Sequence, residues 1–199
     1  MSRKKSILTA VVLLLVILVG GMLAYFTDQE TRTNVFTIGD VKITLNEAGW
    51  TNTTGTNYTR TEATNIAPNT TVAKAPTITN SGTNAAYVFL KVEVPVANVT
   101  VGGTQASQEI FTLGTIDSAW TQVSHTTGTY VFAYGTSSAM TSLASSSTTT
   151  AVFQDVTLKN LDDPTELGTT SPNITVTAYG IQTTDLGVTT PSAIFALFN

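Results

Sequence analysis

Cysteine is absent from the 199-residue chain, and histidine occurs only once, as His125. Without cysteine there is no disulfide scaffold, no thiol nucleophile and no thiolate metal site. One histidine in a Thr-rich loop is typical of a surface residue, and it cannot form a zinc site without several carboxylate partners. The chain also lacks a Gly-x-Ser-x-Gly elbow and a His-Glu-x-x-His motif. We therefore predict no catalytic residue, no metal ligand and no cofactor, and hence a protein that is not an enzyme.

Charge is scarce as well. Charged residues make up 11% of the chain, against about a quarter in an average globular protein. When the basic residues 3–5 are set aside, six basic side chains remain against thirteen acidic ones, a net charge of −7. Such a surface repels phosphate, so we expect no nucleic acid partner. More than a quarter of the chain is Thr or Ser, and the β-branched Thr favours strands over helices.

The N-terminus has the layout of an export signal. Basic residues at positions 3–5 precede an uncharged, strongly apolar run over residues 6–27, which predicts an apolar signal helix. We expect signal peptidase to cut after Ala24, with Met22 at the −3 position, so that Tyr25 becomes the first residue. The alternative is that the run, about 20 residues long, stays as a membrane anchor. Both alternatives place the rest of the chain outside the cell or at its surface.

The segment that follows the expected cut, residues 25–36, is polar in the middle and apolar at both ends. Tyr25 and Phe26 stand at one end, and Val35 and Phe36 stand at the other. The segment lacks the i, i+3, i+4 pattern of an amphipathic helix, and a plain linker would not need these apolar ends. We predict a segment that docks on a protein surface. The alternative is that it is the first strand of its own domain.

Residues 37–199 suit one domain, an antiparallel β-sandwich of about seven to nine strands, jelly-roll-like or Ig-like. The strongest predicted strand is 85–96, which places apolar side chains on one face and charged ones on the other. The apolar face of that strand carries Val88, Leu90, Val92 and Val94. The other predicted strands are 41–45, 120–124, 129–134, 152–158 and 174–182, with a weaker apolar patch at 110–113.

The stretches between the predicted strands are rich in turn-forming residues. We expect a long loop, with at most a weak strand, over 49–69 and a second loop over 137–149. Gly102-Gly103 predicts a turn. Pro191 predicts the start of a short helix whose shared face carries Ile194, Leu197 and Phe198.

Two further patterns leave alternatives open. The acidic loop, residues 162–166, contains Asp162, Asp163 and Glu166; it could hold Ca²⁺, although it lacks the spacing of a known calcium loop. Solvent-exposed acids in a turn are the simpler explanation. Five Asn-x-Ser/Thr sequons also occur, against roughly three expected by chance, so they are weak evidence for glycosylation. The sequons are at Asn52, Asn57, Asn69, Asn98 and Asn173.

Several segments resemble the TasA/camelysin family of secreted biofilm-matrix fibre proteins, which carry a signal peptide cut by a SipW-type peptidase. The N-terminal similarity covers residues 24–31, 34–39 and 41–45, and the downstream similarity covers residues 66–76, 87–92 and 177–182. In this sequence Asn69 stands where the family often has Gly, so the turn there is in question. The resemblance implies a jelly-roll-like sandwich with the mature N-terminal segment as its assembly device.

Taken with that resemblance, the sequence divides into a signal peptide (1–24), an assembly segment (25–36) and a β-sandwich (37–199). The function we expect is a structural subunit of an extracellular fibre or biofilm matrix. Its partners would be copies of itself, other matrix components and, during export, signal peptidase. A strand donated to the next copy gives an open-ended contact and therefore a filament. The alternatives are a monomeric, membrane-anchored adhesion module and, less well supported by the residues, a secreted metallopeptidase.

Overall fold

The structure is a computed structural model, and it describes residues 39–54, 57–168 and 171–198. Regular structure in this part of the chain is almost entirely antiparallel strand, which confirms the all-β class. The strands are β1 (Ile43–Glu47), β2 (Thr51–Thr54), β3 (Asn57–Thr59), β4 (Thr71–Ala73), β5 (Pro76–Asn80), β6 (Ala86–Glu93), β7 (Val96–Val101), β8 (Thr104–Glu109), β9 (Phe111–Leu113), β10 (Trp120–Thr126), β11 (Thr129–Tyr134), β12 (Asp155–Leu158) and β13 (Thr175–Gln182). The helical elements are α2 (Pro191–Phe195) and the short 3-10 helices η1 (Thr61–Ala63), η2 (Pro164–Leu167) and η3 (Ala196–Phe198).

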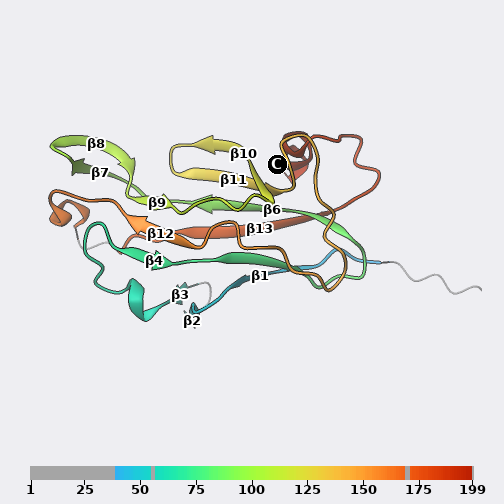
Figure 1. Ribbon diagram of the computed structural model, residues 1–199, viewed down its shortest axis with the longest axis horizontal. Helices are drawn as coiled ribbons and strands as arrows, with labels where there is room; N and C mark the ends of the chain where they lie inside the picture. The colour runs from blue at the N-terminus through green and yellow to red at the C-terminus, as the bar shows by residue number, and fades with distance from the viewer. Residues whose placement is uncertain (1–38, 55–56, 169–170, 199) are drawn as a thin grey trace, which may run out of the picture. The chain divides into compact units, whose positions relative to one another are not determined.

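The first layer is a four-stranded antiparallel sheet in the order β10-β11-β6-β13 (Figure 1). The long strand β6 lies inside this sheet, and it pairs with β13 over its whole length, from Ala86 opposite Gln182 to Glu93 opposite Thr175. Val88, Leu90 and Val92 are fully buried on its inner face, as the alternation of the sequence predicts.

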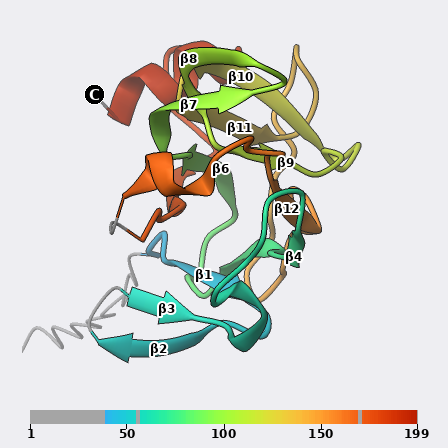
Figure 2. The same ribbon diagram turned by 90° about the vertical axis from the view of Figure 1, so that its left-hand side faces the viewer.

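The second layer is built from two smaller sheets, β1-β5 and β4-β12-β9. Only residues 74–75 separate β4 from β5, and residues 147–152 run beside β5 before the chain enters β12. Thr79 forms a bridge with Thr148, and the Thr149 N–H donates to the Ile78 carbonyl at 2.9 Å. These contacts join the two sheets into one layer whose outermost strands are β1 and β9. The β2-β3 hairpin lies beyond β1, away from β6 and β11 (Figure 2).

The two layers enclose the main apolar core. Its largest fully buried side chains are Phe132, Phe153, Ile78, Leu90 and Ile110. Each buried Phe contributes about 1.5–3 kcal/mol. The buried polar residue Asn80 is satisfied: its Nδ2 donates to the Asn84 and Leu143 carbonyls, both at 2.9 Å, and its Oδ1 accepts from Gly82 N–H at 3.0 Å.

A second apolar cluster covers part of the outer face of the first layer. Phe89 of β6 is fully buried there, with its ring 5.4 Å from Phe195 and 5.8 Å from Phe198. The predicted helix therefore exists, but its shared face differs from the prediction. Ile194 is buried and Phe198 packs on the cluster, whereas Leu197 is 48% exposed. The chain tightens into η3 after Phe195, and this changes which residues share a face.

The strand count also needs correction, since the described residues contain thirteen strands where about seven to nine were expected. Most of the additional strands are short or form small hairpins. β2 and β3 lie within the segment 49–69 that was expected to be mainly loop, and β7 and β8 form a hairpin that the sequence reading missed. Segment 137–149 contains no strand, as predicted.

Two turn predictions have clear outcomes. Gly102 and Gly103 have φ of 58° and 77°, the left-handed values that a type I′ hairpin turn needs at both central positions. They connect β7 to β8. Asn69 has φ of 63°, a conformation that Asn tolerates better than most residues. The turn at this position is therefore kept with Asn in place of Gly.

Candidate assembly edge and polar clusters

The predicted cleavage residues Met22, Ala24 and Tyr25 lie outside the described residues. The remaining predicted assembly residues, Phe26, Val35 and Phe36, lie outside them too. Their roles stay predictions. In the part of the chain that the structure describes, no helix is both long and apolar enough to cross a membrane.

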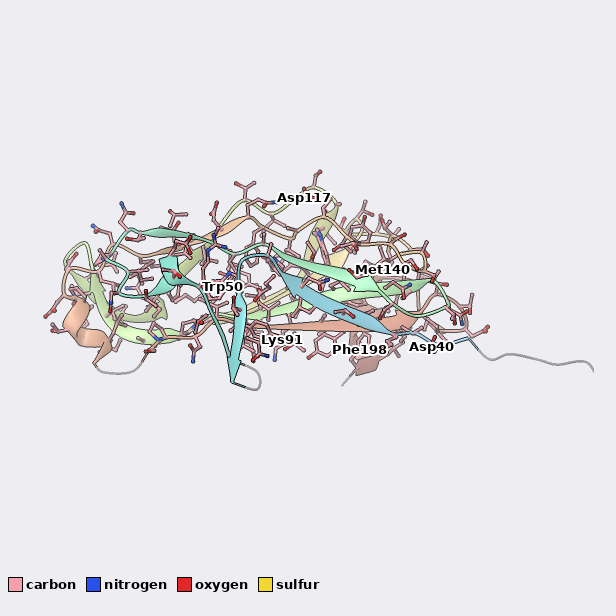
Figure 3. The ribbon with its side chains drawn as sticks, turned by 90° about the horizontal axis from the view of Figure 1, so that it is seen from below. Asp40, Trp50, Lys91, Asp117, Met140 and Phe198 are labelled. Atoms are coloured by element: carbon pink, nitrogen blue, oxygen red, sulfur yellow. The ribbon has the colours of Figure 1, made fainter. Side chains whose placement is uncertain are left out.

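Hydrogen bonds hold the residues just before β1 to the turn between β5 and β6. Asp40 Oδ1 accepts hydrogen bonds from the Thr83 N–H and hydroxyl, both at 3.1 Å, and the Asp40 N–H donates to Thr83 Oγ1 at 3.0 Å. Asn84 N–H adds a bond to the Asp40 carbonyl. The backbone and side-chain hydrogen bonds from Thr83 hold the pKa of Asp40 below its usual value. Figure 3 shows Asp40 at the point where the chain approaches β1.

Among the described residues, the outer edge of β13 is left without a paired strand. One edge of this eight-residue strand pairs with β6 without a register shift, and no strand among the described residues pairs with the other edge. The strand contains no charged residue and no Pro. Charge, Pro and bulges are the usual means by which an edge strand is protected from unwanted pairing. β13 has none of them.

The other open edges are shorter, interrupted or outside the sandwich. β9 has three residues and β1 has five. β10 carries a register shift between Gln122 and Ser124. β8 is regular, but it belongs to a two-stranded ribbon, and four of its six residues are exposed. An added strand would therefore meet little apolar surface at β8.

The acidic loop supports the β7-β8 hairpin with its carboxylates. Asp162 accepts from the Gly102 N–H at 3.1 Å and from the Gly103 N–H at 2.6 Å. Glu166 accepts from the Thr100 N–H at 2.5 Å and the Thr100 hydroxyl at 2.8 Å. Asp163 accepts from Thr165 N–H at 2.9 Å at the start of η2. Five of the loop's carboxylate oxygens are thus occupied by protein donors, which accounts for the acids without a calcium ion.

His125 belongs to a second polar cluster, centred on Glu109. One carboxylate oxygen of Glu109 accepts from the Gly128 N–H at 2.7 Å and lies 3.3 Å from His125 Nε2. The other oxygen accepts from the Tyr130 hydroxyl at 2.7 Å. Burial, the stronger cause, and the Glu109 carboxylate raise the pKa of Tyr130 to about 12. This cluster ties the end of β8 to the β10-β11 turn.

The third polar cluster holds a charge inside the sandwich. The Lys74 side chain is 5% exposed, its ammonium lies 2.7 Å from a carboxylate oxygen of Glu47, and it sits 4.6 Å above the Trp50 ring. The Trp50 Nε1–H donates to the Ala73 carbonyl at 3.1 Å. The Lys74 ammonium is therefore paired both with a carboxylate and with a ring face.

The family to which the chain belongs follows from comparison with known protein families. The family described as camelysin metallo-endopeptidase matches residues 3–112, which are 110 of the 199 residues. The chain belongs to the camelysin family. The predicted resemblance to the TasA/camelysin family is confirmed. The match extends from the N-terminal segment to β9 and ends before β10. No curated protein and no solved structure matches the chain.

The family description names a metal-dependent peptidase, which would need side chains placed to bind a metal ion. Zinc in a peptidase takes three protein ligands, commonly His and Glu. His125 is the one histidine of the chain, and its neighbour Glu109 is already engaged by Gly128 and Tyr130. Within the described residues, no group of three or more His, Asp and Glu side chains is placed to hold a metal ion. The described residues do not fit a catalytic zinc centre.

Proposed function

We propose that this protein is an exported structural subunit of an extracellular fibre or biofilm matrix, and that it is not a peptidase. The mature N-terminal segment, residues 25–36, enters a neighbouring copy as an added β-strand. The observation that carries this proposal is the long, regular and uncharged free edge of β13. An edge of this kind supplies main-chain hydrogen-bond partners to an extended peptide.

The layout of the N-terminus supports the same proposal. Cleavage after Ala24 would produce a free end at Tyr25 only after export, so subunits would not polymerise inside the cell. The proposed partners are copies of the chain, signal peptidase during export, and other matrix components. The absence of cysteine and the single histidine support the non-enzymatic part of the proposal.

A second function, a monomeric adhesion module anchored by residues 1–24, has its own supporting observation. The outer face of the second layer carries a row of neighbouring hydroxyls on Thr44, Thr79 and Thr148. Thr79 and Thr148 share a hydrogen bond of 2.8 Å, and Asn46 donates to Thr79 at 3.0 Å. A preordered hydroxyl face of this kind suits weak contacts with polar surfaces.

A chain that begins at Thr37 separates the two functions. For the fibre subunit we expect this chain to fold, to stay monomeric, and to enter filaments only together with the mature chain. Phe26→Asp and Phe36→Asp should each weaken filament formation, because a buried Phe contributes about 1.5–3 kcal/mol. Asn34→Asp is the control, since it adds the same charge at a polar position of the even-numbered row that also carries Phe26 and Phe36. If the chain beginning at Thr37 polymerises as readily as the mature chain, the proposal is wrong.

A further inference from the structure

We infer that the acceptor is the free edge of β13 and that the incoming segment 25–36 comes from a neighbouring copy and runs antiparallel to β13. This inference rests on the proposed function. It adds the acceptor strand, the direction of pairing and the faces of the donated segment.

β13 combines a long, regular edge with contact to the main core. Val176 and Ala178 on its inner face pack against this core, so a strand added beside them would shield apolar surface as well as gain hydrogen bonds. At Gly180 the second layer comes close: a Cβ there would lie 2.9 Å from Ile43 of β1. The two layers are therefore close together at this end of β13.

The place where the chain enters the sandwich decides which copy can supply an antiparallel strand at this edge. Asp40 is bonded to Thr83, three residues before Ala86, and Ala86 pairs with Gln182 at the end of β13. A segment of the same chain that led into Asp40 along β13 would have its C-terminal end beside Gln182, and it would run parallel to β13. An antiparallel strand at this edge must therefore come from another copy.

Antiparallel pairing is the direction that continues the sheet. β10, β11, β6 and β13 are antiparallel to their neighbours throughout. Antiparallel pairs are also slightly more stable per residue than parallel pairs. An added antiparallel strand would extend the same ladder to a fifth strand.

The segment itself has one uncharged face in the extended conformation. Alternate residues of a strand point to opposite faces, and the odd-numbered positions from Tyr25 to Val35 carry no charge. The even-numbered positions contain the three charged residues Asp28, Glu30 and Arg32. We assign the uncharged row to the core side of the sheet, beside Val176 and Ala178.

The even-numbered row, with its charges and with Phe26 and Phe36, then lies on the outer side, where the sheet carries both charged and aromatic side chains. Thr175 and Thr177 point to that side together with their partners Glu93 and Lys91, and Tyr179 packs against Phe198 in the aromatic cluster. Lys91 and Phe198 are labelled in Figure 3. The assignment leaves no charge facing the core.

The cysteine-free chain allows a direct test by disulfide formation. Mature full-length chains carrying Thr177→Cys are assembled with chains that carry one cysteine at position 28, 29, 30, 31 or 32, and the oxidised links are identified by mass spectrometry. We expect links at the even positions to exceed those at the neighbouring odd positions by about tenfold, because a disulfide needs the two Cβ atoms within about 4.5 Å. Matched acceptors at Ser107 of β8 and Thr121 of β10 should give background levels.

Moving the acceptor to Thr175→Cys tests the direction. In an antiparallel pair the best donor position moves two residues toward Phe36, and in a parallel pair it moves two residues toward Tyr25. A shift toward Tyr25 would overturn the antiparallel inference.

The remaining outcomes separate this inference from the proposed function. Links between copies that favour β8 or β10 over β13 would overturn the β13 acceptor while leaving strand donation intact. A chain carrying both cysteines that links only to itself, with no links between copies in the mixtures, would overturn strand donation altogether.

Discussion

Lys74 keeps a positive charge inside the sandwich, where Glu47 and the Trp50 ring compensate it. Lys74→Ala would leave the Glu47 carboxylate, 12% exposed, without its partner. We expect the free energy of unfolding in urea to fall by about 3–5 kcal/mol. The double variant Lys74→Met with Glu47→Leu removes both charges and should lie close to the parent. Equal losses in the single and double variants would contradict this account.

The Glu109 cluster predicts a response to acid. Burial alone would raise the pKa of Glu109, but the hydrogen bonds from Tyr130, Gly128 and His125 outweigh it and lower the pKa below the ordinary 4.5. A lowered pKa means that the folded state favours the carboxylate. This stabilisation is present above pH 4.5 and is lost as the pH falls through the lowered value.

Tyr130→Phe removes one of those hydrogen bonds. We expect the unfolding free energy of this variant to fall less steeply than that of the parent between pH 5 and pH 3, a range of about two units around the ordinary carboxyl pKa. Urea titrations at several pH values measure this slope. An unchanged slope would show that the tyrosine bond does not shift the acid range.

Tyr130 itself responds at the alkaline end. Its pKa is raised from 10.0 to about 12. The stability that the protonated Tyr130 gives the folded state is therefore complete below pH 10.0 and is lost as the pH rises through about 12. Ultraviolet titration should find one tyrosine that ionises late in the parent. Glu109→Gln should bring that ionisation closer to pH 10.0, because it removes the negative charge beside the hydroxyl. Glu93→Gln, which neutralises a carboxylate of the adjacent strand that does not bond Tyr130, is the control.

At the scale of elements, the C-terminal helix stabilises the sheet by covering Phe89 and Tyr179. The Phe195 ring lies 5.4 Å from each of these rings. Phe195→Ala should lower the unfolding free energy by about 2 kcal/mol, less than a fully buried Phe would, because Phe195 is only half-buried. Leu197→Ala, on the exposed side of the same turn, should change it by less than about 0.5 kcal/mol. Similar losses in both variants would argue against the packing role of Phe195.

The elements that the sequence predicted well are those with strong alternation over a buried face. The pattern Val88, Leu90, Val92 identified β6, and the turn at Gly102-Gly103 was marked by two residues that tolerate positive φ. The hairpin β7-β8 was missed because its strands are held by Asp162 and Glu166, more than 50 residues away in sequence. Long-range polar support of this kind leaves no periodic signal in the strands themselves.

The candidate assembly edge was predictable only in part. The sequence identified 174–182 as a strand, but whether a strand lies inside a sheet or at its edge depends on pairing with distant segments. The burial of Phe89 was likewise hidden, because the residues that cover it come from a helix about 100 residues later. Local patterns define strands, and their neighbours are set by the whole chain.

At the scale of the molecule, export and processing form one prediction. The extracellular protein should have a mass that corresponds to Tyr25–Asn199, as whole-protein mass spectrometry and N-terminal sequencing would establish. Ala24→Asp should block the cut, because signal peptidase requires a small residue before the bond. Recovery of the full-length chain from membranes, with no processed form outside the cell, would favour the anchored module.

The hydrogen bonds between Asp40 and Thr83 have a mechanical consequence. A force applied to the chain ahead of Gly39 would first load these hydrogen bonds. It would next load the Lys42 carbonyl, which accepts hydrogen bonds from the Ser81 and Gly82 N–H groups. The turn between β5 and β6 would thus bear part of the force through these hydrogen bonds, and β1 would bear all of it only after they had broken. In a fibre under tension, β1 would start to peel from β5 only after this short bundle of bonds had failed.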